Sequence, residues 1–162
     1  SNITDSYVGK LDEVRVWNRG LQQHEIVESM VSQTVSASLA SSLVKSWSFD
    51  SEAEELPTTK TNVPLVLTST SQVTSTGGSA GYALSFNGLN QYGEGAMNKM
   101  VTSNTGVRIS AYFKASFATS TDALLSVGQV SLHWTRVGGL GLHVGANSLH
   151  SFKVLNDGAW HH

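Results

Sequence analysis

The sequence predicts an all-β fold, an antiparallel β-sandwich with one short helix. Short runs of alternating apolar and polar residues recur along the chain, and turns rich in Gly, Ser and Asn separate them. Charged residues make up 14% of the 162 residues, against roughly 25% in a typical soluble domain, and Ser, Thr and Gly fill the difference. This composition is typical of a many-stranded protein with polar turns and argues against a charged helical bundle.

The first predicted element is a strand at Leu11–Trp17, where the side chains alternate with a period of two. Its two faces are Asp12, Val14 and Val16 on the core side, and Leu11, Glu13, Arg15 and Trp17 on the outer side. On that outer side, Glu13 and Arg15 are able to form an ion pair.

A helix is predicted to follow the break at Asn18-Arg19-Gly20. Residues Leu21–Val31 change to helical spacing, with an apolar stripe formed by Ile26, Val27, Met30 and Val31. Residues 32–42 are rich in Ser and Ala and contain no large aromatic residue, so we expect a linker there.

The remaining predicted elements are short strands separated by turns, and the Ser-, Thr- and Gly-rich residues 68–81 are predicted to be a loop. The predicted strands are Val44–Phe49, Leu65–Thr68, Tyr82–Phe86, Val107–Phe113, Ala123–Val127, Val130–Trp134, Leu140–Val144 and Leu149–Val154.

Five motifs resemble the laminin-G-like (concanavalin A-like) jelly-roll family. Gly9–Arg19, followed by Leu21 and Glu25-Ile26, is similar to the strand and short helix that close a domain of that family. Gly20 replaces the usual Ala there and Leu11 the usual Ile, and both departures are mild. The other segments are similar to earlier parts of the domain: Trp47–Asp50 to the first strand, Gly81–Gly88 with Tyr92 and Val107–Phe113 to later strands, and Asp157–His162 to the central strand. In Val107–Phe113, Tyr112 stands where the family has Trp.

The order of these motifs implies the domain organisation, because a closing motif precedes the opening ones. We expect residues 1–31 to end one repeat, 32–42 to be a linker, and 43–162 to form the first two thirds of a second repeat. The alternative is one permuted domain in which residues 1–31 pack onto residues 43–162. The family's middle strands are missing from the sequence, so neighbouring repeats or subunits are expected to complete the sandwich.

Composition also excludes some partners. A net charge of −2 gives no field that would attract nucleic acid, and no segment reaches the roughly 18 apolar residues of a membrane helix. The sequence has no cysteine, which excludes thiol catalysis and disulfides. A glycosylation sequon at Asn2-Ile3-Thr4 and the family resemblance favour an extracellular or cell-surface protein.

Two sequence patterns resemble catalytic motifs, and both are predicted to be loops. Gly77–Gly81 fits a G-x-S-x-G nucleophile elbow, but a loop precedes it and a strand follows it, whereas the elbow needs a strand before and a helix after. The acidic run Asp50–Glu55 has the wrong spacing for the paired carboxyls of a glycosidase. We therefore expect the chain not to be an enzyme.

Two further groups are candidate binding residues. A turn over residues 137–139 would place His133 directly opposite His143, where a metal or a pH response is conceivable, although a third zinc ligand is not identifiable. Asp12 is expected to face the core, where it needs backbone N–H donors or a cation. The family resemblance suggests calcium there, with Asp50 and Asn87 as co-ligands by analogy only.

The four tryptophans are predicted mainly to pack in the core, although Trp17, Trp47 and Trp134 would be glycan-stacking platforms if exposed, while Trp160 belongs to the central-strand motif. The expected function is a non-catalytic recognition or adhesion module that binds a glycan or an extracellular protein through loops at the sandwich rim. Two alternatives remain open: a subunit of an extracellular filament built from repeats or shared strands, and an accessory module of a glycan-degrading enzyme.

Overall fold

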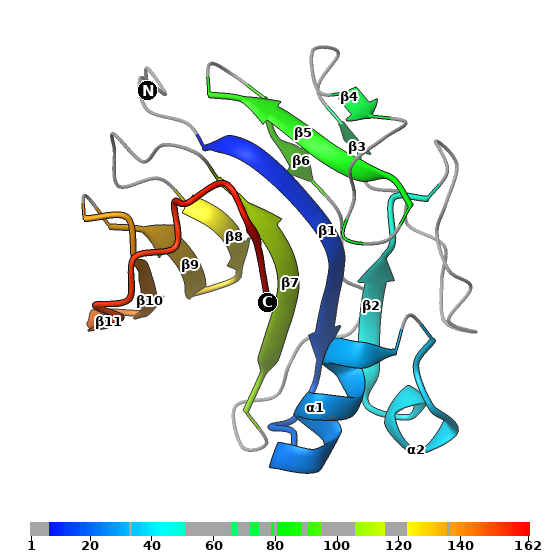
Figure 1. Cartoon of the computed structure of the whole chain (residues 1–162). Helices are drawn as coiled ribbons and strands as arrows, with labels where there is room; N and C mark the ends of the chain where they lie inside the picture. The colour runs from blue at the N-terminus through cyan, green and yellow to red at the C-terminus, as the bar shows by residue number, and fades with distance from the viewer. Residues whose placement is uncertain are drawn as a thin grey trace.

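The computed structural model describes residues 7–32, 34–50, 66–67, 72–74, 79, 81–88, 91–94, 106–115, 123–135 and 137–162. These residues form antiparallel sheets and two short helices, so the predicted all-β class is confirmed (Figure 1). The sequon at Asn2-Ile3-Thr4 lies outside the described residues.

The larger sheet is arranged around β1, which pairs antiparallel with β2, β5 and β7 (Figure 1). Beyond these, β4 pairs with β5 and β12 pairs with β7. The strands are β1 (Val8–Trp17), β2 (Leu43–Trp47), β4 (Gln72–Thr74), β5 (Ala83–Asn87), β7 (Arg108–Lys114) and β12 (Trp160–His161). The presence of β4 corrects the prediction that residues 68–81 are entirely loop.

A second sheet has the strand order β11-β10-β9-β8, and β3 with β6 forms a separate two-stranded ladder. These strands are β3 (Val66–Leu67), β6 (Gly93–Glu94), β8 (Ala123–Val127), β9 (Val130–Trp134), β10 (Leu140–Val144) and β11 (Asn147–His150). The predicted bounds of β8, β9 and β10 are confirmed. The predicted strand Leu149–Val154 is wrong in its bounds, because pairing with β10 begins at Asn147 and β11 ends at His150.

One hydrophobic core joins the two large sheets. Trp134 of β9 is 1% exposed and meets Phe113 of β7 edge-to-face, with ring centroids 5.5 Å apart. Tyr7 stacks on the same indole at 6.4 Å, and its hydroxyl donates to the carbonyl oxygens of Lys10 and Lys114. Burial of aromatic area on this scale is a main source of stability in such a fold.

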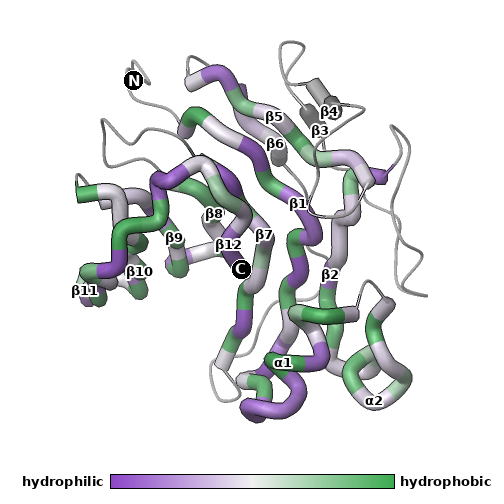
Figure 2. Tube along the Cα trace, viewed as in Figure 1, coloured by the Kyte–Doolittle hydropathy of each residue, from purple (hydrophilic) through white to green (hydrophobic). Residues whose placement is uncertain are grey.

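A β-bulge in β1 changes the phase of its side chains. Asp12 pairs with Tyr112 and Arg15 with Ser110, so two residues of β1 lie opposite one residue of β7. Glu13 lies at the bulge with a φ of 49°. As a result Leu11 joins Val14 and Val16 in the core, and Asp12 moves to the opposite face, which corrects both predicted positions. Figure 2 shows hydrophilic and hydrophobic residues mixed along β1.

The predicted pair of Glu13 and Arg15 is present but is buried, not on the outer side. Their side chains approach to 2.6 Å and are only 6% and 3% exposed. Arg15 also donates to the carbonyl oxygens of Ser29 and Ser32, at the end of helix α1 (Gln23–Val31). A cation at these carbonyls is favourable because the last turn of a helix carries a partial negative charge. Arg15 thus fixes α1 onto the sheet.

The helix at 21–31 is confirmed, but its predicted apolar stripe is wrong. Ser29 faces the sheet, whereas Val27, Met30 and Val31 are exposed. The backbone bonds of Arg15 and a hydrogen bond from the Tyr112 hydroxyl to the Met30 carbonyl hold that side of the helix inward. Hydrogen bonds to the helix backbone therefore determine which face is buried here.

A second short helix, α2 (Ala37–Ala40), lies within the residues predicted to be a linker and buries Leu39. The segment before it contributes β1, and every other strand of the larger sheet comes after it. Residues 8–17 therefore pair with β2, β5 and β7. The repeat boundaries at residues 31 and 43, and the permuted-domain alternative, stay predictions.

The end of the chain belongs to the larger sheet. Trp160 and His161 pair with Lys114 and Phe113 of β7, and the ring of His162 meets that of Tyr112 at 4.8 Å. Trp160 is partly buried. Neither helix in the described part of the chain is long and apolar enough to cross a membrane.

Replacing Arg15 with Ala tests the buried pair. The substitution leaves the Glu13 carboxylate without its cation and two carbonyls of α1 without a donor. Breaking a buried pair typically costs about 3–5 kcal/mol, so we expect R15A to lower the free energy of unfolding by about that amount in urea denaturation. The control is R19A, which removes the more exposed Arg19–Glu25 pair and should cost far less. Equal losses in the two variants would contradict this role for Arg15.

Candidate functional site

A loop that precedes β5 is held by a buried carboxylate from β1. Asp12 is 0% exposed, and its Oδ2 accepts hydrogen bonds from the backbone N–H and the hydroxyl of Ser79, both at 2.8 Å. Its Oδ1 accepts the N–H of Glu13 at 2.8 Å. Donors of this kind stabilise a buried carboxylate, so the predicted role of Asp12 as an acceptor of backbone N–H bonds is confirmed.

A second carboxylate holds the same loop from the end of β2. Asp50 Oδ1 accepts the N–H of Tyr82 at 3.1 Å. The approach requires glycine at position 81, since a Cβ there would lie 2.1 Å from this oxygen and the φ of Gly81 is +77°. Phe49 precedes Asp50 with a φ of 60°, a strained conformation for an aromatic residue that directs the chain toward the loop.

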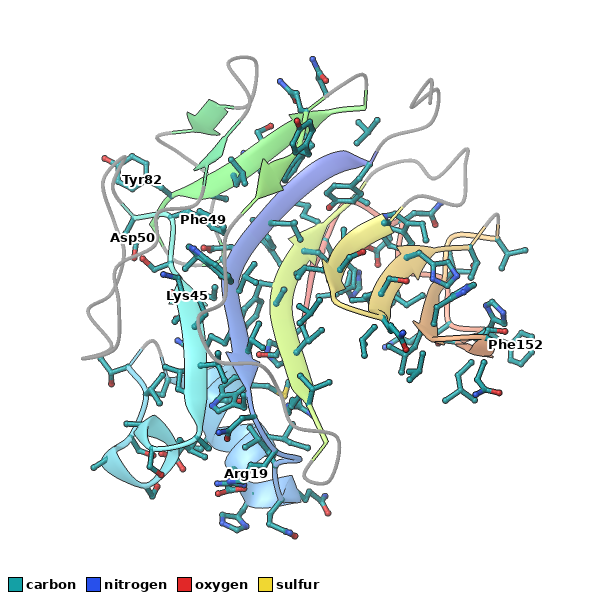
Figure 3. The ribbon with its side chains drawn as sticks, turned by 180° about the vertical axis from the view of Figure 1, so that it is seen from behind. Arg19, Lys45, Phe49, Asp50, Tyr82 and Phe152 are labelled. Atoms are coloured by element: carbon teal, nitrogen blue, oxygen red, sulfur yellow. The ribbon has the colours of Figure 1, made fainter. Side chains whose placement is uncertain are left out.

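We call Ser79 and Gly81-Tyr82, with their anchors Asp12 and Asp50, the rim loop. Figure 3 shows Tyr82 close to Asp50 and Phe49, and directed outward. The Tyr82 side chain is 39% exposed. An exposed aromatic ring whose backbone is held by hydrogen bonds is a typical arrangement for ligand contact.

The rim loop lies beside a group of buried charged residues in β1: Asp12, Glu13 and Arg15. Burial raises the pKa of Glu13, and the nearby Asp12 and Asp50 raise it further, while Arg15 lowers it.

The third calcium ligand suggested by the family resemblance, Asn87, does not lie near Asp12. Asn87 pairs with Val8, four residues along β1 from Asp12, which is roughly 13 Å away.

The described residues of the two motifs that resemble catalytic ones, Gly77–Gly81 and Asp50–Glu55, make structural contacts. Ser79, the serine of G-x-S-x-G, binds the Asp12 carboxylate through both its hydroxyl and its N–H, and β5 follows it where an elbow would have a helix. Of the acidic run, Asp50 is the described residue and serves as the anchor for Tyr82; residues 51–55 lie outside the described part.

The tryptophans proposed as stacking platforms are in the interior. Trp17, Trp47 and Trp134 are 0%, 7% and 1% exposed, so the core interpretation is confirmed for all three. Lys45 lies over the ring of Trp47, with Nζ 5.7 Å from the centroid. Exposed aromatic rings are found instead at positions such as Tyr82, which the sequence analysis places in the strand Tyr82–Phe86.

A separate cluster lies on the second sheet, on the face opposite the core. The predicted register is wrong by two residues: His133 pairs with Gly141, and His143 pairs with Ser131. The two histidines nevertheless touch diagonally, with their Nε2 atoms 3.1 Å apart. His150 of β11 pairs with Gly141 from the other side and completes the cluster.

The three rings lie close together, and burial distinguishes them. Ring centroids are 4.1 Å apart for His133 and His143, and 5.8 and 6.3 Å from these to His150. His133 is buried, whereas His143 and His150 are exposed. Burial, followed by the two neighbouring histidines, lowers the pKa of His133, so its ring is neutral at pH 7.

Sequence reasoning missed His150 because it placed the last strand at 149–154. A partial signal was present in the sequence: Gly141 is a residue without a side chain inside the predicted strand Leu140–Val144. As the side chains stand, no group of three or more His, Asp or Glu in the described residues is arranged to hold a metal ion.

No protein-family model, curated protein or solved structure matches this chain. The laminin-G-like resemblance therefore depends on the sequence motifs alone.

Replacing Asp12 with Asn tests how the rim loop is held. Asn keeps the size of the side chain but removes the charge and turns an amide toward N–H donors. Hydrogen bonds to charged groups contribute about 1.5–3 kcal/mol each, so we expect D12N to lower the free energy of unfolding by at least that amount.

Differential scanning calorimetry of the unmutated chain should show no rise in Tm with calcium, because protein donors already bind Asp12. A calcium-dependent rise that D12N abolishes would contradict this account.

Proposed function

We propose that the chain is a non-catalytic recognition or adhesion module of an extracellular multidomain protein, with a laminin-G-like jelly roll as its fold. The rim loop is the observation that supports this. Asp12 of β1 and Asp50, which follows β2, hold Ser79 and Tyr82 by hydrogen bonds, which lowers the entropy lost when a ligand binds. Tyr82 projects from it with an exposed ring beside a carboxylate.

A glycan is the ligand class that best suits this surface. Tyrosine combines an apolar face, on which a sugar ring can stack, with a polar hydroxyl, and Asp50 is a hydrogen-bond acceptor next to it. The same surface would serve an accessory module of a glycan-degrading enzyme, the third candidate from the sequence.

Glycan-array screening of the chain tests the proposal. We expect saturable binding to at least one glycan class, and we expect Y82A to abolish it without changing the Tm. Y92A is the matched control, because Tyr92 is also exposed, at 51%, but is not part of the rim loop. An array without binding, or binding that Y82A leaves intact, would overturn the assignment to the rim loop.

The second candidate is a structural subunit whose strands are completed by a neighbouring copy, and a different surface favours it. β11 is an edge of its sheet, and apolar side chains beside it are exposed: Val144 at 47%, Leu149 at 71% and Phe152 at 92%. Figure 3 shows Phe152 at the opposite end of the molecule from Tyr82. An edge strand with bare apolar side chains is suited to antiparallel pairing with β11 of a second copy, which gives a symmetric dimer; a filament would be built from such dimers through a second contact.

Light scattering after size exclusion tests the second candidate. We expect a dimer at micromolar concentration, and dissociation to monomer when Phe152 is replaced with Ser. V31S is the control, because Val31 is 81% exposed on α1, away from β11. A monomer at all concentrations, or equal effects of the two substitutions, would eliminate this candidate and leave the glycan-binding proposal untouched.

A further inference from the structure

The histidine cluster contains two nitrogen atoms at the separation of two ligands of one metal ion. Zinc binds histidine nitrogen at about 2.0–2.1 Å, so two tetrahedral nitrogen ligands lie about 3.3 Å apart. The Nε2 atoms of His133 and His143 are 3.1 Å apart. The His133 Nδ1 has no hydrogen-bond partner, so the Nε2 contact is the polar interaction that this buried ring makes.

Gly141 makes the cluster possible. It lies between His133 and His150 in the ladder, and a Cβ on it would be 2.3 Å from Nε2 of His133 and 2.9 Å from Nδ1 of His150. The His133 ring therefore lies over Gly141, in the place that a side chain at this position would take, with a nitrogen of His150 at its border. Any side chain at position 141 would displace the His133 ring.

We propose that His133, His143 and His150 bind one divalent transition-metal ion above Gly141. Imidazole nitrogen suits Zn²⁺, Cu²⁺ and Ni²⁺, and three histidines with an open fourth position form a known type of zinc coordination. His133 and His143 already stand at ligand spacing. As they stand, the three rings do not form a metal-binding group. His150 is exposed, and rotation of its side chain toward the other two would complete the site.

The exposure of the cluster agrees with metal binding. His143 and His150 are exposed, so an ion reaches the cluster directly from solvent.

Isothermal titration of the untagged chain with ZnCl₂ at pH 7.5 tests the proposal. We expect one ion per chain and a rise in Tm. H143A and H150A, both at exposed positions, should each weaken the affinity. Loss of an outer partner of a metal site typically costs roughly 10–100-fold, and loss of a direct ligand should cost at least as much.

The controls separate this cluster from other histidines. H24A changes an exposed histidine on α1, and H161A removes the histidine that bonds Asp157, so neither should alter zinc affinity. G141A should abolish binding by displacing the His133 ring, whereas G20A, where a Cβ would meet nothing within 4 Å, should not alter it. Absence of saturable zinc binding, or affinity unchanged in H143A and H150A, would overturn the proposal. Neither result bears on glycan binding at the rim loop.

Discussion

The bulge at Glu13 is the constraint on which most of this structure depends. One extra residue in β1 places Leu11, Val14 and Val16 on the core side and turns Asp12 and Arg15 to the other. Arg15 can then bind the carbonyls that end α1, and Asp12 can bind Ser79. A regular strand would have directed Asp12 into the apolar core, where a carboxylate without donors is costly.

The strands were predictable because their signal is local. In β8, β9 and β10 the alternation of apolar residues and the glycines between them determine the bounds, and sequence and structure agree there. The bulge was not predictable, since an extra residue leaves the composition of a strand unchanged. The buried face of α1 was missed for a related reason: Ser29 faces the sheet because Arg15 binds its carbonyl, and hydropathy does not record backbone bonds.

The sequence identified individual residues of the candidate sites but not their contacts. Asp12, His133 and His143 could be singled out, but their partners Ser79 and His150 could not. The partner of Asp12 is Ser79, 67 positions away, and depends on how the loop folds. The third histidine became visible only with the true register, in which Gly141 separates His133 from His150. The register between distant residues depends on how all strands of the sheet pack together, which local sequence patterns do not specify.

The placement of β1 also has a consequence for synthesis. Tyr7 and its acceptor Lys114 are 107 positions apart, and β7 is one of the strands that must cover β1. Ribosomes add about 5–20 residues per second, so β1 waits roughly 5–20 s after emerging before its last partner exists. During that interval its core-side residues are open to solvent and to other nascent chains. Non-local pairing of this type also folds slowly, so chaperone binding to residues 8–17 would be most valuable while the chain is still being translated.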